Sequence, residues 1–148
     1  MRQHPEVTRN AFERVYDMIM AAGVEVRETR REKKLHYRFF DDPTNDGHDA
    51  VFGLDDSLAH LVNALKSAAR GYGIERRVLL LHGPVGSSKS TIVRQLKKGL
   101  ERYSALDEGA LYTLGWYDES TGDTHWCPMN EEPLHLIPER FRADVLSQ

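Results

Sequence analysis

Residues 79–91 read LLLHGPVGSSKST, and this stretch decides the fold. The motif of a phosphate-binding loop (P-loop) is G-x-x-x-x-G-K-[ST], placed between a buried strand and a helix. Gly83, Lys89 and Ser90 occupy the first glycine, the lysine and the hydroxyl positions, whereas Ser88 replaces the second glycine. The spacing therefore predicts a P-loop with one departure from the motif.

The residues on both sides of the loop predict the strand and the helix that the motif requires. The continuous apolar run 78–81 is typical of a strand buried on both faces of a parallel sheet. After the loop, Ile92, Leu96 and Leu100 recur at helical spacing, so we expect a helix from about Ser90. The order strand, glycine-rich turn and helix predicts an α/β P-loop NTPase fold with a parallel sheet flanked by helices.

Apolar spacing predicts two further helices before the loop. The first covers residues 8–22, with Gly23 suited to a C-cap. The second begins after Leu54, where carboxylates favour a helix N-terminus. Residues 24–40 show no decisive pattern, and 41–49 have the composition of a loop.

The remainder of the chain predicts one more strand and a turn. Residues 109–117 are typical of a strand, and the polar stretch 118–126 indicates a turn or a hairpin tip. We therefore divide the chain into an N-terminal helical and charged segment, residues 1–45, and a P-loop domain, residues 46–148.

Each part of the loop has a chemical role in holding a triphosphate. Backbone N–H groups of the turn and of the helix N-terminus bind phosphate oxygens without rearranging. Gly86 can take a positive φ near the phosphates, Lys89 is expected to reach the β- and γ-phosphates, and Ser90 to coordinate Mg²⁺. The residues expected to line the phosphate site are Gly83, Pro84, Val85, Gly86, Ser87, Ser88, Lys89, Ser90 and Thr91.

Ser88 leaves two interpretations open, and its backbone conformation separates them. With a negative φ, serine at this position costs little. With a positive φ, a side chain costs about 1–2 kcal/mol. We favour the interpretation that the loop tolerates the serine. A glycine-rich turn without any ligand explains neither Lys89 nor the neighbouring hydroxyls.

A second feature also indicates a nucleotide. Val51, Phe52 and Gly53 precede a predicted helix that leads to the P-loop strand. An aromatic residue before a helix is usually part of a core. An apolar residue followed by a small one in this position is also the arrangement seen in AAA+ ATPases, so we expect these three residues to lie near the adenine.

Composition narrows the class of protein. The net charge of −3 is uneven, because residues 1–40 carry +3 and residues 101–148 carry −7. An acidic final third repels a phosphate backbone and argues against nucleic acid as a partner. The apolar runs fall short of the roughly 18 residues of a membrane span, and Cys127 has no second cysteine to pair with. We expect a cytoplasmic protein that is not bound to a membrane.

Several separate stretches together resemble the N-terminal region of the PrkA-type serine protein kinases. They are RVYDMI (14–19), YRFF (37–40), VFGLDDSL (51–58), the P-loop region (76–101), GALYTL (109–114) and CPMNEEPLHLIPERFRADV (127–145). The last stretch is the most specific, because a P-loop alone is shared by many families.

The resemblance implies an AAA-type ATP-binding domain over residues 46–148. ATP and Mg²⁺ are then the expected cofactors, with a homo-oligomer as a possible assembly. The intact protein is expected to phosphorylate serine in protein substrates. The alternative is an ATP-dependent scaffold, regulatory or protease-like module without kinase activity.

The acidic Walker B strand of such domains has no counterpart here. No apolar run that ends in paired carboxylates follows the loop, and Glu131 and Glu132 follow Pro-Met-Asn instead of a buried strand. We therefore expect an incomplete domain that ends before Walker B and binds ATP without efficient turnover. The catalytic residues, and whether this chain is itself an enzyme, stay open.

Overall fold

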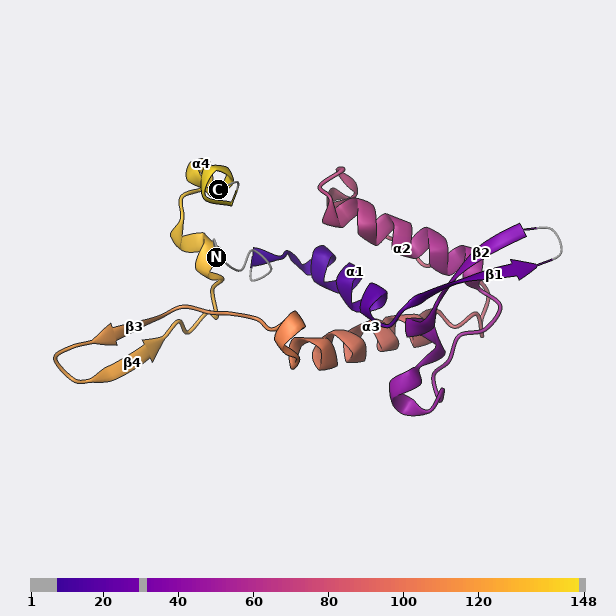
Figure 1. The fold of residues 1–148 in the computed structure, drawn as a ribbon, viewed down its shortest axis with the longest axis horizontal. Coiled ribbons are helices and arrows are strands. Elements are labelled where there is room, and N and C mark those ends of the chain that lie inside the picture. Colours follow the sequence, from indigo (N-terminus) through magenta and orange to yellow (C-terminus); the bar gives the residue numbers. More distant parts are fainter. Residues whose placement is uncertain (1–7, 30–31, 147–148) are drawn as a thin grey trace. The chain divides into compact units, whose positions relative to one another are not determined.

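The computed structural model of this chain describes residues 8–29 and 32–146. Its internal contacts divide the described residues into a first unit within residues 10–105 and a second unit, which contains residues 8–9 and 106–146 (Figure 1). Parts of the predicted N-terminal segment, residues 1–7 and 30–31, lie outside the described residues. From Asn10 onward, that segment belongs to the same unit as the P-loop. A boundary near residue 45 stays a prediction.

The first unit holds three α-helices and one pair of strands. In chain order they are α1 (Ala11–Ala21), β1 (Val24–Thr29), β2 (Glu32–Tyr37), α2 (Asp55–Ala69) and α3 (Lys89–Ser104), with 3₁₀ turns η2 (Arg38–Asp41), η3 (Pro43–Asn45) and η4 (Ile74–Arg76). The three helices predicted from apolar spacing are thus confirmed. The undecided stretch 24–40 forms the two strands and η2.

Local side chains fix where α1 begins. Asn10 and Glu13 form a reciprocal capping box, in which the Glu13 N–H donates to Asn10 Oδ1 at 2.9 Å and the Asn10 N–H donates to Glu13 Oε2 at 2.6 Å. These bonds satisfy two backbone donors that a helix N-terminus otherwise leaves unpaired.

The core of this unit lies where α1, α2 and α3 meet the end of β2. Its most deeply buried large side chains are Ile19, Phe40 and Val62. Helix α3 comes close to α1 and η2 at Gly99, where an added Cβ would lie 2.7 Å from ring atoms of Phe39. The absence of a side chain at Gly99 therefore permits this helix packing.

The predicted parallel sheet is wrong for the described part of the chain, where the strands form two antiparallel pairs. Residues 78–81 form no strand, and Val78 and Leu80 are 93% and 83% exposed. A strand needs neighbours to pair its backbone N–H and C=O groups. Neither antiparallel pair is joined by residues 78–81, so the apolar run has no strand partner among the described residues.

The second unit contains a hairpin and a short C-terminal helix. Its elements are η5 (Asp107–Gly109), β3 (Gly115–Asp118), β4 (Asp123–Trp126), η6 (Pro133–Leu136) and α4 (Glu139–Leu146). The turn predicted over 118–126 is confirmed for residues 119–122, whereas Asp123–Trp126 form strand β4. The strand predicted over 109–117 is wrong before Gly115, because Leu111 is exposed and lies beside no strand in the described ranges.

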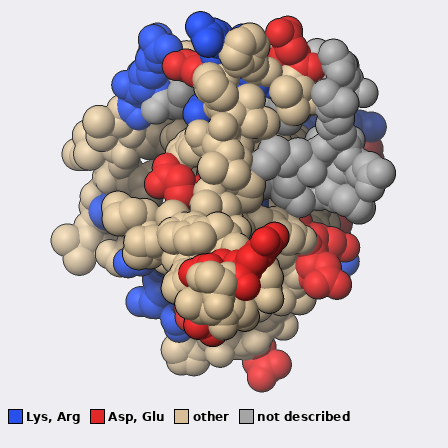
Figure 2. All heavy atoms as spheres, turned by 90° about the vertical axis from the view of Figure 1, so that its left-hand side faces the viewer, with Lys and Arg blue, Asp and Glu red and all other residues tan. Residues whose placement is uncertain are grey.

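The surface of the second unit is rich in acidic groups. Residues 106–146 contain nine Asp and Glu side chains and two Arg side chains. Figure 2 shows acidic side chains (red) on the largely uncharged surface nearest the viewer. Among the helices that the structure describes, none has the length and apolar character needed to cross a membrane.

A buried histidine joins β2 to the start of α2. His36 is 5% exposed, with Nδ1 2.8 Å from Asp55 Oδ1 and Nε2 2.8 Å from Asp41 Oδ2. Both ring nitrogens face carboxylates, so both donate when the ring is protonated. Burial alone lowers the pKa of His36, but the hydrogen bonds to Asp41 and Asp55 outweigh it and leave that pKa raised.

This cluster predicts that the unit loses stability as the pH rises. A raised folded-state pKa stabilises the fold below the unfolded histidine value of about 6.5, and the contribution disappears as pH climbs through the folded value. Urea unfolding across this range should show a falling free energy of unfolding for the wild type. The slope should be smaller in His36→Gln, while the exposed His60→Gln control should keep it. Equal slopes in all three proteins would contradict the assignment.

Candidate functional site

The loop and the start of α3 have the local geometry that the P-loop motif requires. Helix α3 begins at Lys89, directly after the turn, and Ser88 is its N-cap residue. The first backbone N–H groups of a helix have no partner within it, so they are free to bind an anion. Gly86 has a φ of 83°, the positive value that the sequence predicted.

Lys89 is folded across the loop. Its Nζ donates to the carbonyl oxygens of Gly83 at 2.9 Å and Pro84 at 2.5 Å, and to Ser87 Oγ at 2.8 Å. The Ser87 hydroxyl in turn donates to the Pro84 carbonyl at 2.8 Å. The ammonium group thus uses its three donors on the loop itself, and an anion has to replace these bonds to reach it.

Ser88 has the backbone conformation that favours glycine. Its φ of 56° and ψ of 12° are left-handed, and its side chain makes no capping hydrogen bond. The condition under which serine costs little, a negative φ, is therefore not met. The strain amounts to about 1–2 kcal/mol. That the loop tolerates this strain and still binds phosphate stays a prediction.

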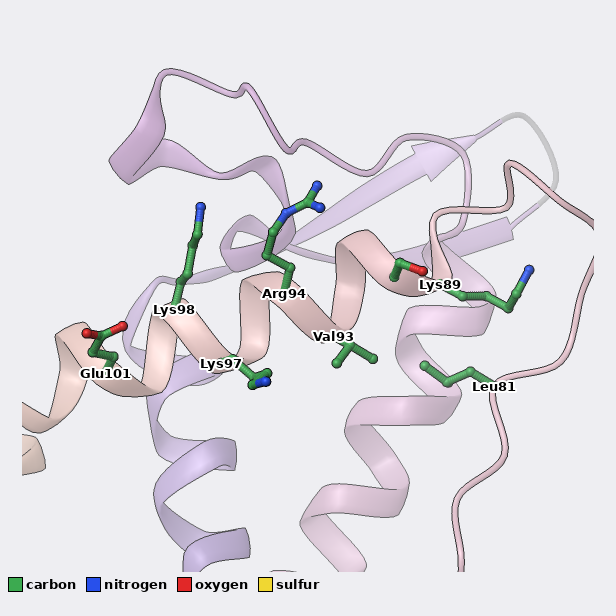
Figure 3. Close-up of a pocket in the computed structure, with 8 residues that line it drawn as sticks. Leu81, Lys89, Val93, Arg94, Lys97, Lys98 and Glu101 are labelled. Carbon is green, nitrogen blue, oxygen red and sulfur yellow. The ribbon is translucent and has the colours of Figure 1, made fainter.

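A basic cavity of about 740 Å³ lies along α3. It is lined by Leu81, Lys89, Ser90, Val93, Arg94, Lys97, Lys98 and Glu101. Figure 3 shows Arg94 and Lys98 pointing to one side of α3 and Val93 to another, with Leu81 on the separate segment that precedes the loop. The lining carries four cations and one carboxylate, and although Arg94 is paired with Asp49, the remaining cations leave a positive charge that attracts anions.

A second cavity, of about 500 Å³, lies between α2 and the loop. Its lining includes Leu54 and Ser57 from the start of α2, and Gly83, Ser87 and Lys89 from the loop. Most of its remaining lining is apolar, supplied by leucines of α2 and of residues 79–81 and by Ile92. Lys89 therefore lies where a polar loop meets an apolar groove.

The predicted adenine segment leads to this second cavity without lining it. Val51 is buried, and its N–H donates to the Phe40 carbonyl at 2.9 Å. Phe52 is 80% exposed and Gly53 has a φ of 71°. Leu54, the next residue, lines the cavity together with loop residues. Val51 thus anchors the segment in the core, while Phe52 is accessible.

The other predicted loop residues differ in accessibility. Val85 at the tip is fully exposed, Ser90 lines the basic cavity, and Thr91 is half-buried.

The histidines of the second unit do not gather with two or more other metal-binding side chains in the described part of the chain. His135 Nδ1, for example, contacts Glu131 Oε1. No group of three or more metal-binding side chains gathers within residues 8–29 and 32–146.

Sequence reasoning missed three residues that connect α3 to the preceding loop: Asp49, Arg94 and Gln95. A signal for Gln95 was present, because it lies three residues after Ile92 and next to Leu96, on the apolar side of the predicted helix. A polar residue at a core position indicates a specific hydrogen-bond partner.

The comparisons with known proteins agree with these motifs. The profile of the PrkA AAA domain matches residues 1–148. The chain belongs to this family. The resemblance that the sequence indicated is thereby confirmed, and with it the assignment to the AAA-type P-loop class, although the described strands are antiparallel.

Two curated relatives carry different functional names. The ATP-dependent protease PrkA of Bacillus subtilis (strain 168) is 39% identical over 145 residues, which cover 97% of this chain and 20% of the relative. The serine/threonine kinase YeaG of Escherichia coli (strain K12) is 29% identical over 151 residues, covering 99% and 21%. The chain therefore spans about a fifth of these relatives. No solved structure gives a significant match.

The left-handed serine gives a direct stability prediction. Ser88→Gly should raise the free energy of unfolding by up to about 1 kcal/mol, because relief of about 1–2 kcal/mol of strain exceeds the entropy cost of glycine. Ser88→Ala retains the Cβ and should match the wild type. Urea denaturation of the three proteins measures this. A glycine variant no more stable than the alanine variant would show that the position is unstrained.

Proposed function

We propose that this domain binds ATP with Mg²⁺ through residues 83–91, as the nucleotide-binding part of a PrkA-type serine protein kinase. The observation that carries the proposal is the direct passage from a glycine turn into α3 at Lys89 and Ser90. This passage brings a lysine, a hydroxyl and unpaired helix N–H groups to one place. The family membership supports the same reading.

The donors in the loop fit a triphosphate. Backbone N–H groups at the first turn of α3 are suited to bind phosphate oxygens, with the helix dipole adding to the attraction. The Lys89 ammonium group would exchange its three loop acceptors for phosphate oxygens. Because those acceptors lie within the loop, this exchange would also free the Gly83 and Pro84 carbonyls and reshape the turn.

The Ser90 hydroxyl fits a magnesium ligand. Mg²⁺ prefers oxygen ligands and usually takes only one or two from protein, with phosphate and water completing its shell. When bound, it neutralises charge on the phosphate oxygens. Ser90 is the second residue of α3 and lines the basic cavity. Its hydroxyl therefore lies beside the proposed phosphate site.

The wider activity follows from the relatives' names. YeaG is named a serine/threonine kinase, which supports phosphorylation of a protein substrate by the intact protein. The name of the Bacillus subtilis relative supports the second candidate, an ATP-dependent protease-like or regulatory module. We place the protein in the cytoplasm, with self-association through the AAA domain and without nucleic acid or membrane as partners.

Calorimetric titration of Mg·ATP into the chain tests the proposal. The wild type should bind in the micromolar range. Lys89→Ala should lose about 10- to 100-fold in affinity, because hydrogen bonds to charged groups contribute about 1.5–3 kcal/mol. Lys66→Ala, on α2, should bind like the wild type. A folded Lys89→Ala variant that binds ATP as tightly as the wild type would refute a role for this loop.

A further inference from the structure

The second turn of α3 is attached to the loop that precedes Val51. The Gln95 side chain is 4% exposed, and its Nε2 donates to the carbonyls of Asp49 at 2.8 Å and Phe40 at 3.3 Å. Arg94 forms two hydrogen bonds with Asp49, from Nε to Oδ2 at 2.9 Å and from Nη2 to Oδ1 at 2.5 Å. Asp49 is therefore bound to α3 through both its backbone carbonyl and its side chain.

Hydrogen bonds within residues 40–51 also hold this loop together. Val51 N–H donates to the Phe40 carbonyl at 2.9 Å and closes the loop at its base. Within it, the buried Asp42 accepts from the Asp49 N–H at 3.0 Å and from Asn45 Nδ2 at 3.1 Å. Because these bonds restrict movement inside the loop, the contacts with α3 position the loop as a whole.

The hydrogen bonding of Gln95 indicates that its role is to position the loop more than to stabilise the fold. Its Oε1 is buried and has no hydrogen-bond partner among the described residues. An unpaired buried acceptor costs free energy that an apolar side chain of the same size avoids. What only the amide supplies at this position is two donors aimed at two carbonyls. Gln95 thus fixes the geometry of the chain at Phe40 and Asp49.

Helix α3 connects these contacts to the loop proposed to bind phosphate. Ser90 and Arg94 are four residues apart, so they lie on the same side of the helix, and both line the basic cavity. Asp49 is two residues before Val51. The first turn of this helix therefore lies at the proposed phosphate site, and its second turn holds Asp49 and Phe40, the residues that adjoin and anchor the segment 51–53.

We propose that Gln95 and the Arg94–Asp49 ion pair are positioning residues that set the position of residues 51–53 relative to the phosphate site and so determine selectivity for the adenine base. This inference rests on the proposed ATP binding and on the prediction from the sequence that residues 51–53 lie near the adenine. It assigns a function to three residues outside the P-loop motif.

The proposal separates base recognition from phosphate binding. Every nucleoside triphosphate offers the same phosphates to Lys89 and to the N-terminus of α3. Discrimination among bases depends on where Phe52 and its neighbours lie. Releasing the loop from α3 should therefore weaken ATP binding and reduce its advantage over GTP, and leave the affinity for inorganic tripolyphosphate unchanged.

The test measures dissociation constants of wild type and variants for Mg·ATP, Mg·GTP and Mg·tripolyphosphate. Gln95→Met keeps the length of the side chain and removes both donors. Asp49→Asn removes the charge of the ion pair. In each, the ATP-to-GTP preference should fall about tenfold, with tripolyphosphate affinity within about twofold of wild type. Arg102→Met, in the last turn of α3, is the matched control and should change neither.

A charge exchange adds a rescue arm. Asp49→Arg alone should lose selectivity, and the double variant with Arg94→Asp should recover part of it, since the ion pair is restored with reversed polarity. If Gln95→Met fails to fold, Asp49→Asn and this exchange decide the question. A merely structural role would lower stability and all three affinities together.

The outcomes distinguish the two proposals. Unchanged ATP-to-GTP preference in folded variants, or a wild type without any preference, would overturn the positioning role while ATP binding stands. A wild type that binds neither a nucleotide nor tripolyphosphate would overturn the proposed function and this inference with it.

Discussion

Helix α3 makes apolar contacts with the core and polar contacts with the loop before Val51, and α1 packs against it. Its apolar face, with Ile92 and Tyr103, packs into the core. Its N-terminus leaves backbone donors unpaired at Lys89 and Ser90, which suits an anion. Its second turn is fixed by buried polar contacts to the loop before Val51. A helix with a purely apolar packing face could not hold that loop in one defined position.

The loop before α3 contains a residue with a strained backbone and a lysine whose ammonium group is hydrogen-bonded within the loop. Ser88 is left-handed, and the three donors of Lys89 are bound within the loop. Strained backbone of this kind persists where the surrounding structure holds it, and such positions cluster at ligand sites. Here the lysine bonds bridge the turn from Gly83 to Ser87 and stabilise it without a ligand. A phosphate would therefore compete with the protein's own carbonyl groups, which sets a cost on binding.

Sequence reasoning succeeded where the cause of structure is local. The spacing of apolar residues predicted α1, α2 and α3, because a helix pairs its backbone groups within itself. It failed for residues 78–81, because a strand depends on partners that the local pattern does not identify. The loop and its left-handed turn could be located from the motif, but the φ of Ser88 could not. The contacts of Gln95 could not be predicted either, since they are made with Phe40 and Asp49, which lie 55 and 46 residues away in the sequence.

The most direct test of the account is a titration of ¹⁵N-labelled chain with Mg·ATP, followed by the backbone amide resonances. The largest shifts should occur at residues 86–90, where the turn passes into α3, with smaller shifts at residues 51–53. The Lys89 ammonium resonance should also move as its loop contacts are exchanged for phosphate. Saturating Mg·ATP that leaves the amides of residues 83–91 unshifted would contradict the central claim that this loop is a phosphate site.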